Sequence, residues 1–300
     1  LVVGADDRAL WQLPSASLQV HCDDVSIAGA ATMLPELPPS TDLIIVLLPK
    51  AREQLAFWLA ALQGQLQQPT ELWLIGPASG GIRGGVTLLK QVCGEASQLD
   101  SARHCKLFSA MLAPAAFELS AWQKKWSTHD IEVCSYPGVF SHGRADAGTE
   151  LLLDTLSAVG VSGAGSALDI GCGAGVISAW LAQRKLQVTA VDVSATAVAA
   201  TEQTLMNNAL SAQLVCSDLY QQVQGRFDLV VTNPPFHDGT RRTTEITRQL
   251  IDRAPLHLRA GGSLWMVANQ GLPYGDWLRA AFSDVQVAAE NRQFRVWHCQ

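Results

Sequence analysis

Short apolar runs alternate with segments of helical periodicity between residues 166 and 236. The runs that have the length of buried strands are residues 167–170, 187–191, 214–216 and 228–232. After the first run, apolar side chains recur at helical spacing at Val176, Ile177, Trp180 and Leu181. This alternation predicts an open α/β sheet of the Rossmann type.

The first half of the chain carries a similar pattern. The predicted strands are residues 1–3, 17–21, 42–48 and 71–75, and an amphipathic helix is predicted over residues 51–66. Residues 42–50 align with residues 228–236 without a gap, and the strands that follow them match as well. The repeat predicts two copies of one α/β domain. A polar stretch at residues 120–130 suggests a linker, so we expect domains over residues 1–130 and 131–300.

The two copies differ where chemistry would occur. Leu47 and Leu48 stand where the second copy has Asn233 and Pro234, and only Gly4 follows the first strand. We expect the first copy to be degenerate, without a cofactor site, and to serve substrate recognition or support of its partner. Its glycine pairs at 80–81 and 84–85 precede no Lys-Ser/Thr, which predicts a flexible loop rather than a phosphate site.

Composition narrows the class of protein. Of the 300 residues, 48% are hydrophobic and the formal net charge is −6, which is typical of a globular protein. No apolar run approaches the roughly 18 residues that cross a bilayer, so no membrane is expected. The seven cysteines form no C-x-x-C pair, which favours reduced thiols in the cytoplasm and no metal site. The chain opens without a methionine or a basic segment, so we expect no signal peptide and further residues upstream.

The acidic balance argues mildly against a nucleic-acid partner, which normally requires a basic face. Five arginines nevertheless follow the last predicted strand of the second copy, at positions 241, 242, 248, 253 and 259. They fit a positive patch beside the site or a solvated helix face equally well.

A glycine turn follows the first strand of the second copy. Glycines at positions 171, 173 and 175 permit a tight turn with positive φ and leave room for a ligand at the start of a helix. Carboxylates follow or close three successive strands, at Asp169, Asp192 and Asp218. Ligands of open α/β sheets lie at this edge, so the three acids converge on one crevice. The spacing G-x-G-x-G resembles class I S-adenosylmethionine (SAM) methyltransferases rather than dinucleotide-binding proteins.

The fourth strand leads into Asn233-Pro234-Pro235-Phe236. A conjugated amine is a poor nucleophile, and two hydrogen-bond acceptors can draw its lone pair out of the π system. We expect the Asn233 side-chain oxygen and the Pro234 carbonyl to accept the two N–H bonds. Pro235 would stiffen the loop and Phe236 would stack on a planar base.

Three motifs together resemble the ribosomal RNA small subunit methyltransferase C family: residues 137–141, 169–176 and 233–239. The resemblance implies methyl transfer from SAM to a guanine N2 of 16S rRNA in the small subunit, by a protein expected to be a monomer. It assigns the methionine part of SAM to Asp169 and the glycine loop, the ribose to Asp192 and the adenine to Asp218. The full set expected to contact the cofactor is Phe140, Ser141, Asp169, Gly171, Cys172, Gly173, Gly175, Asp192, Val193, Asp218, Leu219 and Asn233.

Other functions stay open at this point. An enzyme with the same tetrapeptide could methylate a guanine of the large subunit or a protein glutamine amide, although the latter enzymes prefer Tyr in place of Phe236 and lack a duplicated domain. A non-catalytic RNA assembly protein could keep SAM as a structural ligand, which the intact Asn233 argues against.

Overall fold

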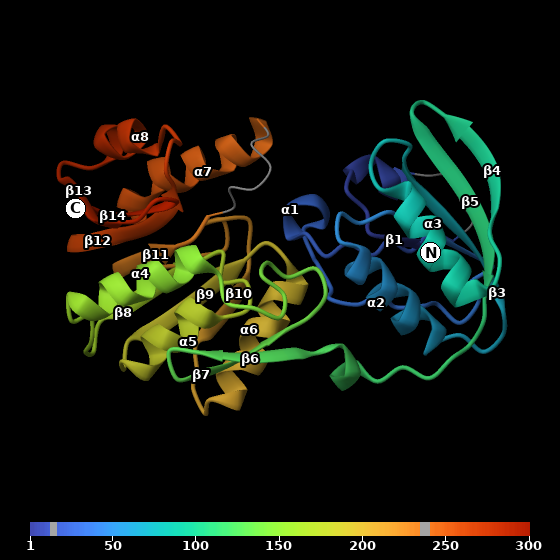
Figure 1. Cartoon of the computed structure of the whole chain (residues 1–300), viewed down its shortest axis with the longest axis horizontal. Coiled ribbons are helices and arrows are strands. Elements are labelled where there is room, and N and C mark those ends of the chain that lie inside the picture. The colour runs from blue at the N-terminus through green and yellow to red at the C-terminus, as the bar shows by residue number, and fades with distance from the viewer. Residues whose placement is uncertain (13–16, 235–240) are drawn as a thin grey trace. The chain divides into compact units, whose positions relative to one another are not determined.

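The computed structural model describes residues 1–12, 17–234 and 241–300. The chain divides into two compact units (Figure 1). Unit 1 comprises Leu1–Gln123 with Ser194–Thr196, and unit 2 comprises Lys124–Val193 with Ala197–Gln300. The helices of the described residues include none that is long and apolar enough to cross a bilayer.

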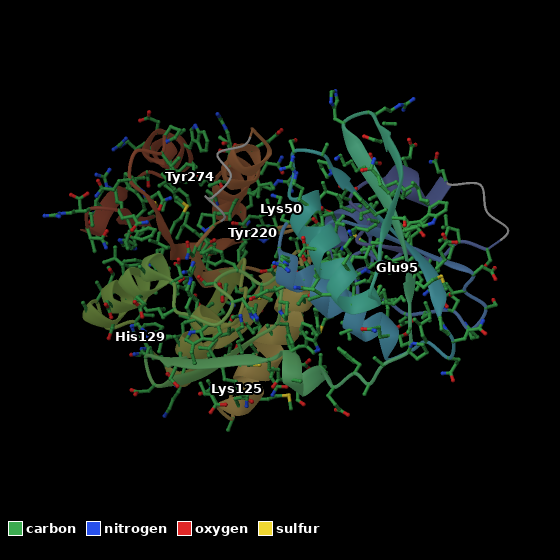
Figure 2. All side chains as sticks on the ribbon, turned by 45° about the vertical axis from the view of Figure 1, so that its right-hand side comes forward. Lys50, Glu95, Lys125, His129, Tyr220 and Tyr274 are labelled. Carbon is green, nitrogen blue, oxygen red and sulfur yellow. The ribbon has the colours of Figure 1, made fainter. Side chains whose placement is uncertain are left out.

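The boundary falls before the expected residue 130 because the polar stretch there is not a linker. Strand β6 (Lys124–Thr128) pairs antiparallel with β7 (Ile131–Ser135) and so belongs to unit 2. Lys125 forms an ion pair with Glu132 at 3.4 Å, and His129 contacts Asp154 at 3.0 Å (Figure 2).

Unit 2 is built on a seven-stranded sheet of order β10-β9-β8-β11-β12-β14-β13 within the described residues. Its strands are β8 (Ser166–Ile170), β9 (Gln187–Asp192), β10 (Gln213–Cys216), β11 (Phe227–Thr232), β12 (Leu258–Asn269), β13 (Val285–Glu290) and β14 (Phe294–Cys299). The first five in this order run parallel, and β14 and β13 are antiparallel additions. The carboxyl ends of β8, β9, β10 and β11 therefore meet at one edge.

The helices of unit 2 are α4 (Ala147–Ala158), α5 (Val176–Gln183), α6 (Ala195–Asn207), α7 (Arg241–Arg253) and α8 (Tyr274–Ala281), with a short η3 (Ala254–His257). Apolar residues of the central strands are buried on both faces, as in β11, where Val230 and Val231 have no exposed surface. The buried Tyr220 hydroxyl donates to the Leu250 carbonyl at 3.1 Å, which fastens α7 to this core (Figure 2).

Unit 1 has a five-stranded sheet of order β1-β2-β3-β5-β4 within the described residues. The strands are β1 (Val2–Val3), β2 (Leu43–Leu47), β3 (Thr70–Pro77), β4 (Ser97–Ala102) and β5 (Cys105–Leu112). The helices are η1 (Arg8–Gln12), α1 (Val25–Ala28), α2 (Arg52–Gln63), α3 (Ile82–Cys93) and η2 (Leu119–Trp122). The predicted α/β fold is confirmed in both units.

The two sheets share one topology (Figure 1). The order β1-β2-β3-β5-β4 repeats β8-β11-β12-β14-β13, with two parallel pairings followed by two antiparallel ones in each. Unit 2 extends beyond β8 by two further strands, β9 and β10, which have no counterpart in the described part of unit 1. The shared order supports the interpretation of the repeat as a duplication.

Two local predictions in unit 1 are wrong. Residues 17–21 form no regular strand, and only Val20 bridges to Val2. Gly84 and Gly85 lie inside α3 rather than in a loop. A methyl group on Gly85 would lie 2.7 Å from the Leu48 Cδ1 atom, so the glycine lets α3 pack closely on the sheet. Tertiary packing thus outweighs the low helix propensity of glycine.

Candidate functional site

The glycine turn joins β8 to α5 at the carboxyl edge of the sheet. Gly171, Gly173 and Gly175 have φ values of 78°, 55° and 81°, which side chains rarely adopt. A methyl group on Gly175 would lie 2.9 Å from the Thr201 Cα atom, so this glycine also permits close packing on α6. At Gly171 and Gly173 a Cβ atom would meet no described protein atom within 4 Å. This part of the turn is therefore open to a ligand.

Asp169 lies beneath the turn and is fully buried. Its Oδ2 atom accepts a hydrogen bond from Ser178 Oγ at 2.5 Å, and Oδ1 has no partner among the described residues. Burial raises the pKa of this carboxyl group to about 7; the nearby Asp192 charge also raises it, and the Ser178 hydrogen bond lowers it. A buried oxygen without a donor fits a cationic ligand group such as the amino group of the methionine part of SAM.

Asp192 closes β9 beside the same turn. Its Oδ2 atom accepts a hydrogen bond from the Gly173 N–H at 3.0 Å, which fixes the carboxylate next to the glycines. Val193 follows it directly, so the acid and its neighbour lie at the edge expected for a ribose.

Asp218 and Leu219 follow β10, and the Ser217 N–H donates to the Asp192 carbonyl at 2.8 Å. Asp218 accepts a hydrogen bond from Gln221 at 2.8 Å. Leu219 adopts a φ of 49°, which sharpens the turn after the strand. The structure thus brings the three predicted acids to successive strand ends.

The side chain of Cys172 packs into the protein. It is buried, and its Sγ atom accepts a hydrogen bond from Thr201 Oγ1 at 3.2 Å. Burial, together with the charges of Asp192 and Asp169, raises the pKa of this thiol well above its ordinary value. Cys172 therefore shapes the turn and is not a thiolate nucleophile.

Asn233 follows β11 at the same edge. Its Nδ2 atom donates to Asp146 Oδ2 and to Thr149 Oγ1, each at 2.8 Å. Its buried Oδ1 atom has no partner in the described part of the chain. Because buried polar atoms are almost always hydrogen-bonded, this oxygen fits a donor from a bound substrate. Pro234 is buried beside it, whereas Pro235 and Phe236 lie outside the described residues.

Sequence reasoning did not assign Asp146 and Thr149 to the site. Asp146 is the N-cap of α4, and its Oδ2 atom accepts a hydrogen bond from the Thr149 N–H at 2.8 Å. An Asp immediately before a leucine-rich helical run signals a helix start. Nothing in that local signal shows the contact with Asn233, which is 87 positions away.

Phe140 and Ser141 belong to the segment between β7 and α4. Phe140 is 45% exposed, so its ring is accessible to a ligand, and Ser141 adopts a φ of 53°. The segment is fastened by a contact of 2.6 Å between Ser135 Oγ and His142 Nδ1.

The arginines after β11 are partly neutralised. Arg248 pairs with Asp252 at 3.5 Å, and Arg259 pairs with Asp228 at 2.9 Å. These two pairs favour a solvated face over a free positive patch at those positions. The described residues contain no cluster of His, Cys, Asp or Glu able to hold a metal ion.

In unit 1, the turn that corresponds to the glycine turn is filled by a side chain. Gly4 follows β1 with a φ of 74°, and a methyl group there would lie 2.6 Å from the Trp58 ring. His21 meets that ring edge-on at a centroid distance of 5.4 Å, and the Gly4 N–H donates to His21 Nδ1 at 3.4 Å. The buried indole covers the turn where a ligand would approach in the other unit.

Comparison with known proteins decides the family. Residues 130–298 match the family described as Methyltransferase small domain, and residues 15–126 match its N-terminal counterpart. Ribosomal RNA small subunit methyltransferase C of Alcanivorax borkumensis is 49% identical over 99% of this chain and 92% of its own length. The chain belongs to the ribosomal RNA small subunit methyltransferase C family. The Yersinia enterocolitica member is 37% identical, over 96% of this chain and 81% of its own length.

A solved structure of this family resembles the fold over most of the chain. It is the T. thermophilus 16S rRNA N2 G1207 methyltransferase in complex with AdoMet and guanosine. The TM-score is 0.77 at 26% sequence identity, covering 86% of this chain and 72% of the other. The resemblance recognised in the sequence is confirmed.

Proposed function

We propose that this chain transfers a methyl group from SAM to the N2 amine of a guanine in the 16S rRNA of the small ribosomal subunit, acting as a cytoplasmic monomer. The observation that carries the proposal is the Asn233 Oδ1 atom, which has no hydrogen-bond partner among the described residues and lies at the strand edge that also holds the glycine turn. The T. thermophilus 16S rRNA N2 G1207 methyltransferase, which was solved in complex with AdoMet and guanosine, supports the same ligands here.

SAM supplies a methyl group that is already activated by its sulfonium charge. Asp169 Oδ1, the glycine turn, Asp192 and Asp218 would hold the cofactor, with Phe140 and Ser141 enclosing it. Asn233 Oδ1 and the Pro234 carbonyl would accept the two N–H bonds of the guanine amine and turn its lone pair toward the methyl group. The amine nitrogen would gain the methyl group as the sulfur–methyl bond breaks and S-adenosylhomocysteine leaves. The charged nitrogen would then lose a proton to water, so no strong base is required. Positioning supplies most of the rate, an effect that can reach roughly 7–11 kcal/mol.

Labelled SAM and four substrates test the proposal. Purified small subunits, large subunits, naked 16S rRNA and a protein fraction are each incubated with the chain, and the modified nucleoside is identified by mass spectrometry. We expect N2-methylguanine from small subunits. Methylation of large subunits alone would establish the first alternative, and SAM binding without transfer to any substrate would establish a non-catalytic assembly protein.

For unit 1 we propose a share in rRNA recognition and in support of unit 2, since the Trp58 indole covers its turn. Residues 124–300 alone should melt below the intact chain and bind small subunits more weakly, with a shallower salt dependence as phosphate contacts are lost. A fragment that folds, binds SAM and methylates as well as the intact chain would refute both roles.

A further inference from the structure

The amide group of Asn233 is held from the N-terminus of α4. Its Nδ2 atom has two acceptors there, Asp146 Oδ2 and Thr149 Oγ1. The carboxylate is itself fixed, because the same Oδ2 atom accepts the Thr149 N–H at 2.8 Å. Thr149 is 9% exposed, so its hydroxyl is largely shielded from water. The Asn233 amide, the Asp146 carboxylate, and the hydroxyl and main-chain N–H of Thr149 form a closed set of hydrogen bonds between the end of β11 and the start of α4.

These acceptors decide which way the amide faces. A carboxylate oxygen can only accept a hydrogen bond. A flipped amide would set Asn233 Oδ1 against Asp146 Oδ2 at about the same distance, and the two oxygens would repel each other. Nδ2 is therefore held on the α4 side, and Oδ1, which no described residue contacts by a hydrogen bond, is left on the other side of the amide.

We propose that Asp146 and Thr149 are positioning residues for methyl transfer. They hold the Asn233 amide so that Oδ1, rather than Nδ2, meets the guanine amine. This inference rests on the proposed function. Hydrogen bonding to a carboxylate also polarises the amide, which makes Oδ1 a stronger acceptor while positive charge develops on the amine nitrogen. The folded chain already bears the free-energy cost of burying Asn233 Oδ1 without a hydrogen-bond donor among the described residues, so this cost does not add to the barrier of methyl transfer.

Two variants of Thr149 separate positioning from packing. Thr149→Val keeps the shape of the side chain and removes the hydroxyl, whereas Thr149→Ser keeps the hydroxyl. We expect Thr149→Val to lower kcat roughly 10- to 100-fold, because a small misplacement of a catalytic group has effects of this size. Thr149→Ser should stay within about threefold of wild type. SAM affinity by calorimetry should be unchanged in both, and the melting temperature of Thr149→Val should fall only by the few degrees that the loss of one buried hydrogen bond causes.

Two variants of Asp146 complete the test. Serine is as good an N-cap as aspartate, but its oxygen lies one bond closer to the main chain. Asp146→Ser should therefore preserve the helix and lower kcat as Thr149→Val does. Asp146→Asn keeps an acceptor oxygen and removes only the charge, so its kcat should fall less than that of Asp146→Ser.

The outcomes are distinguishable. If Thr149→Val retains kcat within threefold of wild type while Asn233→Ala is inactive, the positioning role is overturned and the proposed function stands. A loss of kcat that Thr149→Ser shares, or that accompanies a loss of SAM affinity or a fall in melting temperature larger than one hydrogen bond explains, shows helix support instead and also overturns it. If the wild-type chain methylates no guanine, the proposed function and this inference both fall.

Discussion

The Thr232 hydroxyl donates a hydrogen bond of 2.8 Å to the main-chain carbonyl of Ile170. The two residues are register partners in β11 and β8, and each is followed directly by a site residue, Asn233 or Gly171. This buried bond ties the loop expected to hold the amine to the turn expected to hold the cofactor.

Removing the Thr232 hydroxyl should loosen the loop after β11 and the glycine turn after β8. Thr232→Val should lower the free energy of unfolding by about 1 kcal/mol, the usual net worth of such a bond, and should lower kcat. Thr232→Ser, which keeps the hydroxyl, is the matched control. Chemical unfolding and the methyl-transfer assay measure the two effects, and a valine variant with wild-type kcat would show that the tie does not matter for catalysis.

Asn233→Ala should abolish transfer with little effect on SAM affinity. The lost oxygen acts on the amine as charge develops, and loss of one such group costs roughly 100-fold or more in kcat. Single-turnover transfer to small subunits and calorimetry with SAM give the two quantities. Activity within threefold of wild type would refute the assigned role.

Asp192→Ala should weaken SAM binding by roughly tenfold or more, since hydrogen bonds to a charged group are worth about 1.5–3 kcal/mol. Asp192→Asn is the matched control, because it can still accept the Gly173 N–H and so preserves the turn. An unchanged calorimetric affinity in the alanine variant would mean that this carboxylate does not contact the cofactor.

The buried Asp169 should make unit 2 less stable as pH rises. Its pKa is raised from 3.8 to about 7, chiefly by burial, so the folded state binds more protons than the unfolded state between these values. The stability that the protonated form contributes is lost as pH rises through 7. The free energy of unfolding of Asp169→Asn, relative to that of the wild type, should rise by an amount on the order of a few kcal/mol from pH 4 to pH 8. Urea unfolding at both pH values checks this, and a difference that does not change with pH would contradict it.

The buried His21 should make unit 1 less stable as pH falls. Burial lowers its pKa from 6.5 to about 4, although the hydrogen bond to the Thr32 carbonyl opposes the shift. The unfolded state binds more protons between these values, so unit 1 loses stability as pH falls from 6.5 toward 4. Hydrogen exchange of the peptides covering β1 and His21, corrected for intrinsic rates, should show lower protection at pH 5 than at pH 7. Equal protection would show that protonating His21 does not destabilise unit 1.

Most of the fold and part of the candidate site could be predicted from the local spacing of residues in the sequence. The glycine turn and the acids after successive strands are short-range signals, and the structure places them at one edge. The contact of Asn233 with Asp146 and Thr149 could not be predicted, because an N-cap pattern does not show which distant side chain will meet it. The error at Gly85 has a similar cause, since the close approach of the Leu48 and Leu74 side chains, which local sequence does not show, explains why glycine suits α3 there.

The two strands that unit 2 has beyond β8 bear on the history of the chain. Asp192 closes β9, and unit 1 has no counterpart of that strand among its described residues. Point mutations that introduced glycines after β1 and removed the Trp58 indole would still leave no strand end for an acid at the position of Asp192. A turn and acid arranged as in unit 2 would therefore require the insertion of a whole segment into unit 1, and no set of single substitutions supplies it.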